Sequence, residues 1–105
     1  DLTPRTNPAG PERVFDAALH AANRLPGWSL VGYMEDRQEI QAEAATRVLR
    51  FVDDVTIRIA GRDHAAVVHV RSASRVGRGD FGQNARNIRA SFAELDRQMR
   101  VQATH

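Results

Sequence analysis

The segment DVTIRIAGRDHAAVVHVRS, residues 54–72, decides the fold because it holds two alternating stretches separated by a turn. Every second residue on either side of the Gly-containing GRDH turn is apolar, and the residues between are mostly polar. Side chains alternate between the two faces of a strand, so this pattern predicts two antiparallel strands with one dry and one wet face. The inward set is Val55, Ile57, Ile59, Ala66, Val68 and Val70.

Two more strands are expected before this segment. WSLVGYM (Trp28–Met34) is rich in strand-forming residues, and the polar EDRQ that follows is typical of a turn. EIQAEAATRV (Glu39–Val48) alternates again, with Ile40 and two alanines on one face and Gln41 and Glu43 on the other. The four strands follow one another through short connections, which predicts an antiparallel meander.

Two amphipathic helices flank the four strands. The first begins at Pro11 and ends before Pro26, and the second begins at Phe81. Burying each large apolar side chain is worth roughly 1.5–3 kcal/mol, so both helices should cover the dry sheet face. We therefore predict an α+β two-layer sandwich as a single domain over residues 11–105, after an extended lead-in at residues 1–10. The apolar stripe of the second helix is Phe81, Ala85, Ile88, Phe92, Leu95 and Met99.

The composition is that of a single globular domain and excludes several classes of function. The chain has 105 residues and no cysteine, which excludes disulfides and thiolate chemistry. Fifteen basic residues, all arginine, face thirteen acidic ones, so the net charge of +2 does not favour nucleic-acid binding. The four histidines are scattered along the sequence, so we expect no metal site and no cofactor. We also predict no catalytic residue, since His69 and Ser72 fall on opposite faces of one strand and GxSxG is absent.

The turn at residues 61–64 predicts a register for the last two strands. Counting outward from it places Asp54 opposite Arg71, and Thr56 opposite His69. Arg71 would then lie on the wet face and support Asp54.

Matching inward faces extends this register to the preceding strand. It places Arg47 opposite Asp54 and Glu43 opposite Arg58. Opposite charges across strands contribute roughly 0.2–1 kcal/mol, so these residues are interpreted first as solvated ion pairs. The alternative is a polar ligand or partner surface that uses His69 as a proton carrier, because imidazole titrates near neutrality.

The stretch VRSASRVGRGDFGQN, residues 70–84, joins the last strand to the last helix. Its functional interpretation is an anion-binding loop, because a glycine-rich turn opening a helix presents N–H groups to an anion. The additional donors would be Ser72, Ser74, Arg75, Arg78 and Asn84.

The same stretch also has a structural interpretation, as a corner of the fold. Asp80, or alternatively Gly79, stands at the N-cap position of the last helix, where the negative charge of Asp80 opposes an anion. The loop should lie near Asp53 and Asp54, which would pair with Arg75 and Arg78.

Nearly the whole chain resembles the domain-of-unknown-function family numbered 1499, found in bacteria and plant plastids. The matching runs are DLTP near the start, GW at residues 27–28, ATRVLRFVDDVTIRI at 45–59 and VRSASRVGRGDFGQNARNIR at 70–89. The last is the most specific, and it departs from the family pattern at Gly79, where serine is expected. The resemblance implies no activity, substrate or cofactor. It implies a soluble domain held at the cell envelope, on its periplasmic face, by a membrane attachment preceding Asp1.

Three functions remain as hypotheses. The leading one is a non-enzymatic binding or interaction module of an envelope-associated protein, because no catalytic constellation is present and one sheet face carries both signs of charge. The second is a sensor or enzyme for a small anion that uses the loop before the last helix. The third, and least favoured, is nucleic-acid binding by the basic C-terminal half. A cytoplasmic location is the alternative to the envelope.

Overall fold

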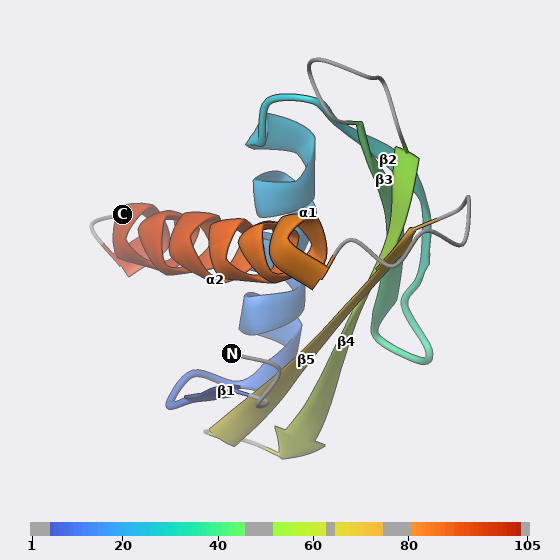
Figure 1. Ribbon diagram of the computed structural model, residues 1–105. Helices are drawn as coiled ribbons and strands as arrows, with labels where there is room; N and C mark the ends of the chain where they lie inside the picture. Colours follow the sequence, from blue (N-terminus) through green and yellow to red (C-terminus); the bar gives the residue numbers. More distant parts are fainter. Residues whose placement is uncertain (1–4, 46–51, 63–64, 75–80, 104–105) are drawn as a thin grey trace.

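The computed structural model describes residues 5–45, 52–62, 65–74 and 81–103. They form an open antiparallel sheet with two helices on one side of it (Figure 1). The α+β class is therefore as predicted. The elements are β1 (Arg5–Asn7), α1 (Pro11–Arg24), β2 (Trp28–Met34), β3 (Glu39–Ala45), β4 (Val52–Arg62), β5 (Ala65–Ser74) and α2 (Phe81–Ala103).

The sheet has five strands in the order β1-β5-β4-β3-β2, one more than predicted. The meander of four is right for β2 to β5, but residues 5–7 of the expected lead-in form the additional strand β1. Its Arg5 lies opposite Val68, and its Asn7 lies opposite Ala66. Proline favours edge strands because it donates no ladder hydrogen bond, and Pro8 directly after β1 fits that position.

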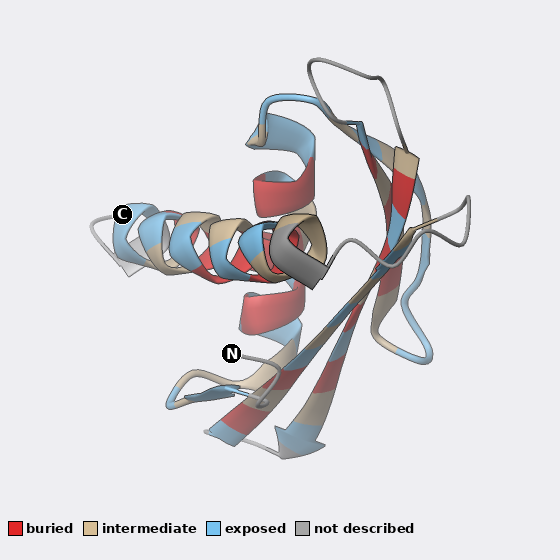
Figure 2. Ribbon diagram, in the orientation of Figure 1, coloured by how far each residue is buried: buried red, intermediate tan, exposed pale blue. Residues whose placement is uncertain are grey.

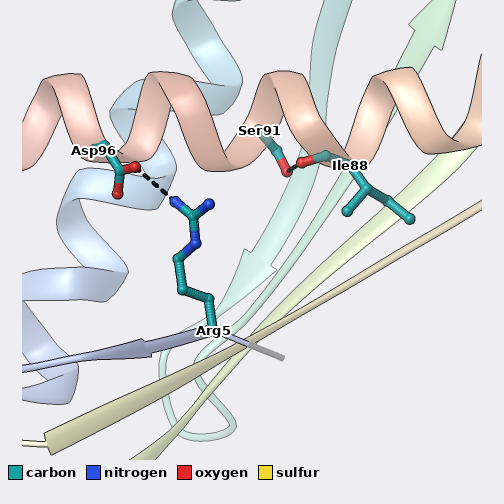
Figure 3. Close-up of polar contacts among 4 residues, drawn as sticks. All are labelled: Arg5, Ile88, Ser91 and Asp96. Carbon is teal, nitrogen blue, oxygen red and sulfur yellow. Dashed lines mark hydrogen bonds and ion pairs between the residues drawn. The ribbon is translucent and has the colours of Figure 1, made fainter. Parts of the chain in front are cut away.

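Arg5 fastens β1 to α2. Its Nη1 donates to Asp96 Oδ2 across 2.6 Å (Figure 3). Its Cζ also lies 4.6 Å from the centre of the Phe92 ring. On the same helix the hydroxyl of Ser91 donates to the carbonyl of Ile88, which satisfies this buried polar side chain within α2 (Figure 3).

The predicted register between β4 and β5 is wrong by two residues. Arg71 lies opposite Thr56, not Asp54, and His69 lies opposite Arg58, not Thr56. Pairing continues to Arg62 and Ala65, so only residues 63 and 64 stand between the strands. A shift of two residues leaves every side chain on the same face, which is why the alternation alone did not exclude it.

The predicted register between β3 and β4 is also wrong, by four residues. Arg58 lies opposite Glu39, not Glu43, and Asp54 lies opposite Glu43, not Arg47. β3 is described from Glu39 to Ala45, and the Ala45 N–H donates to the carbonyl of Gly27 across 2.9 Å; the rest of the predicted strand, residues 46–48, lies outside the described residues. Arg47 lies outside the described residues.

The core lies between the sheet and the helices, as the red segments of Figure 2 show. α1 lies against β2 to β5, while α2 packs on α1 and β5. Four buried alanines on α1 permit this close packing, because they add no bulk between the layers. The predicted stripe of α2 is buried at Ile88, Phe92 and Leu95, and Met99 is half-buried. No helix of the described residues is long and apolar enough to cross a membrane.

Candidate functional site

A group of polar side chains lies on the dry face where it approaches the beginning of α2, and we call it the polar cluster. Alternation explains its sheet members, since Asp53 continues the inward row of Val55, and two serines continue that of Val70. The helix members face them from the first turns of α2. The polar cluster comprises Asp53, Ser72, Ser74, Asn84 and Asn87.

Asn87 stands at the centre of the polar cluster. Its Nδ2 donates to Asp53 Oδ2 across 2.8 Å and to Ser72 Oγ across 3.1 Å. Ser72 Oγ in turn donates to Asn84 Oδ1 across 2.7 Å, and Asn84 Nδ2 donates to Ser74 Oγ across 3.5 Å. Asp53 and Asn87 are only 2% and 4% exposed, so they exchange their hydration for these hydrogen bonds.

The polar cluster brings together three of the predicted loop donors, Ser72, Ser74 and Asn84, with the predicted supporting residue Asp53. Their hydroxyl and amide groups bond to one another, and the group contains a carboxylate that opposes an anion. Within the described residues this geometry fastens the sheet to α2. The remaining loop residues named from the sequence, Arg75, Arg78 and Asp80, lie outside the described residues.

Asn87 was not predicted from the sequence to belong to a site. The feature that could have indicated it is its position one residue before Ile88, on the flank of the apolar stripe of α2. Ser91 and Gln98 also lie on this flank, and all three side chains are uncharged and buried. An uncharged polar residue beside an apolar helix stripe is thus a candidate for a buried hydrogen-bonding role.

The second region is the sheet face that carries no helix. Arg58, His69 and Arg71 are exposed there on β4 and β5, and we call them the cationic patch. With Thr56 and Glu39 they line an open depression of about 300 Å³. His69 lies directly opposite Arg58, and Arg71 directly opposite Thr56, so the two arginines and the histidine occupy adjacent positions of two paired strands.

A row of hydrogen bonds across the sheet fixes the neutral and acidic neighbours of the cationic patch. Thr56 Oγ1 donates to Gln41 Oε1 across 2.9 Å, and Gln41 Nε2 donates to Glu39 Oε2 across 3.1 Å. Among the described residues, none makes a hydrogen bond or ion pair with the side chains of Arg58, His69 or Arg71. The depression is therefore lined by two guanidinium groups and one carboxylate, that of Glu39, which already accepts a hydrogen bond from Gln41.

The described residues of the predicted wet face lie on the sheet face without helices, but their cross-strand neighbours differ from the prediction. Glu43, Asp54, Arg58, His69 and Arg71 all belong to the face without helices. The corrected register places Asp54 and Arg58 both diagonal to Arg71, on either side of Thr56. Over the part of the chain that the structure describes, no three histidine, aspartate or glutamate side chains are grouped as metal ligands would be.

Comparison with known proteins gives a family but no function. The model of a family described as "Protein of unknown function (DUF1499)" matches residues 1–95. Neither the comparison with curated proteins nor that with solved structures gives a match.

Proposed function

The chain belongs to the DUF1499 family, and from its geometry we propose that it is a non-enzymatic binding module whose open sheet face recognises an anionic group. The observation that carries this proposal is the cationic patch. Three exposed cationic or protonatable side chains are adjacent on paired strands, without an internal partner among the described residues.

The chemistry of the patch favours an oxyanion. A guanidinium group presents several N–H donors in one plane and binds carboxylate or phosphate through two parallel hydrogen bonds. Arg58 and Arg71 lie on neighbouring strands, diagonal to one another, so one anion between them would relieve the repulsion of like charges. Thr56 adds a hydroxyl to the same depression.

The loop before α2 supports an anion site less well. Its described donors Ser72, Ser74 and Asn84 bond to one another beside the carboxylate of Asp53. Binding an anion there would require breaking these bonds near a like charge, whereas the cationic patch requires no such rearrangement. Nucleic acid is the least supported ligand, since the patch comprises three residues rather than a long basic stripe.

The test is a titration of the protein with phosphate, sulfate and acetate, followed by backbone amide NMR shifts. We expect shifts at Thr56, Arg58, His69 and Arg71 that saturate, and no saturating shift in the Arg58→Ala/Arg71→Ala double variant. Arg58→Lys/Arg71→Lys should retain weaker binding, because lysine keeps the charge but loses the planar fork.

The matched control is Arg13→Ala/Arg100→Ala, which removes two exposed helix arginines and changes the net charge equally. It should bind like the wild type. Saturating shifts confined to Ser72, Ser74 and Asn84 would instead favour the loop, and no saturating shift anywhere would refute the anion-binding role.

We also propose that the domain acts at the cell envelope, on its periplasmic face. The support is the family resemblance, which implies soluble domains behind a membrane attachment. Fractionation of cells that produce the full-length protein, followed by protease treatment of spheroplasts, tests this location. Recovery in the cytoplasmic fraction, protected from protease, would refute it.

A further inference from the structure

The outer edge of β2 carries an exposed apolar surface. This seven-residue strand contains no charged residue. Its Val31, Tyr33 and Met34 are 62%, 51% and 39% exposed, and of the other described residues only Val101 is a large hydrophobic with comparable exposure. Sheet edges in soluble proteins are usually protected by charges, short strands, β-bulges or a covering element, and of these β2 has only the register shift between Leu30 and Gly32. The sheet order ends at β2, and in Figure 1 no described element lies beyond it.

The opposite edge of the sheet is protected. β1 is only three residues long and includes Arg5, whose side chain binds Asp96. The contrast between the edges indicates that β2 is covered by a partner. We propose that the partner is a second copy of this chain, and that the two β2 strands pair antiparallel about a two-fold axis near Val31.

The sequence of β2 suits such self-pairing. Val31 is the central residue of Trp28–Met34, so antiparallel pairing brings the two Val31 side chains together and places each Trp28 opposite the other Met34. Pairing between β2 and β3 shifts register between Leu30 and Gly32. A two-fold axis near Val31 places this irregular stretch opposite its own equivalent in the partner, as in any isologous interface.

Charges beyond the two ends of β2 favour a second copy over an unrelated peptide. Arg24 precedes β2, is exposed, and has no ion pair with any described residue. Glu35 follows β2 and lines a depression of about 310 Å³ with Glu12 and Phe15 among its other residues. The Phe15 ring meets that of Tyr33 edge-on, with centroids 6.2 Å apart, which places this depression beside the end of β2.

Antiparallel pairing uses these charges twice. The beginning of one β2 lies beside the end of the other, so Arg24 of each copy approaches the acidic depression of its partner. A parallel arrangement would instead place like ends together. The charge pattern therefore specifies both the occupant and its direction.

The test is the mass of the protein by sedimentation equilibrium from micromolar to millimolar concentration. We expect a reversible dimer of the 11.7 kDa chain. Val31→Lys should weaken it by about tenfold or more, since two like charges would then meet at the axis. Val101→Lys is the matched control, because Val101 is exposed to a similar degree on α2, and it should leave the dimer unchanged.

A charge exchange tests the direction of pairing. Arg24→Glu alone and Glu35→Arg alone should each weaken the dimer, and an equimolar mixture of the two variants should restore it as a heterodimer. A monomer at all concentrations, equal effects of the two valine variants, or no recovery in the mixture would overturn the proposal. Neither Val31 nor Arg24 lines the cationic patch, so these outcomes leave the anion-binding proposal independent.

Discussion

The side-chain amide of Asn87 donates to the carboxylate of Asp53 across 2.8 Å, joining two buried residues 34 positions apart. This bond connects α2 to β4, although the main packing of α2 is against α1 and β5. The polar cluster therefore joins the end of β5 to the beginning of α2, the two elements that the glycine-rich stretch connects in the sequence.

We expect Asn87→Leu to destabilise the fold by roughly 3 kcal/mol, because it leaves the buried Asp53 carboxylate without its amide donor. Asp53→Asn should cost less, since it removes the charge but retains an acceptor. Urea unfolding of both variants measures the difference. Asn23→Ala is the control, because Asn23 is exposed and bonds only within α1. An Asn87→Leu loss no larger than that of the control would contradict the role of this bond.

Two glycines of the sheet should respond to alanine in opposite ways. Gly61 has φ +123°, and a Cβ there would lie 2.1 Å from the carbonyl oxygen of Ala65. Gly61→Ala should therefore cost about 2 kcal/mol or more, through backbone strain and displacement of β5. A Cβ at Gly32 meets nothing within 4 Å, so Gly32→Ala should be neutral or stabilising by up to roughly 1 kcal/mol. Thermal melting of the two variants tests this contrast, and similar losses in both would contradict it.

Removing the Arg5 side chain should loosen β1. Its ion pair with Asp96 joins side chains that are 47% and 42% exposed, so the pair itself is worth at most about 1 kcal/mol. Contact with the Phe92 ring adds roughly 0.5–1 kcal/mol, so Arg5→Ala should cost more than Asp96→Ala. Hydrogen exchange at the Thr6 amide in each single variant and in the double variant measures the coupling. Added salt should reduce the coupling but not the ring contact.

Local patterns predicted which face each residue occupies. Alternation through Val55 and Ile57 placed the sheet core correctly, and the helical stripe through Ile88 identified the buried face of α2. The same alternation did not determine register, because a shift by two or four residues exchanges only residues of the same face. For this reason Arg58 and Arg71 lie on the predicted face, but Arg58 lies opposite Glu39 rather than Glu43, and Arg71 lies opposite Thr56 rather than Asp54.

The remaining differences concern contacts between distant segments. β1 has only three residues, and its strand character depends on β5 and on Asp96, far along the chain. The polar cluster was recognised only in part. Ser72 was interpreted as an anion donor rather than as a continuation of the inward row of Val70, and Asn84 as another donor rather than as the hydrogen-bond acceptor of Ser72. Asp53 continues the inward row of β4 and is buried, but aspartate is mostly exposed in proteins, so its charge did not suggest a buried position.

The position of β1 beside β5 has a consequence for the order of assembly. Arg5 lies opposite Val68 in the sheet and bonds to a residue 91 positions later. Of the five strands, β1 is synthesised first, but it can pair only after β5, the last strand, has been synthesised. Local hairpins from β2 to β5 can form earlier, because their connections are short, whereas closing so long a loop is slow. A nascent chain halted before α2 would therefore expose to chaperones the apolar surface of α1 and β5 on which α2 packs.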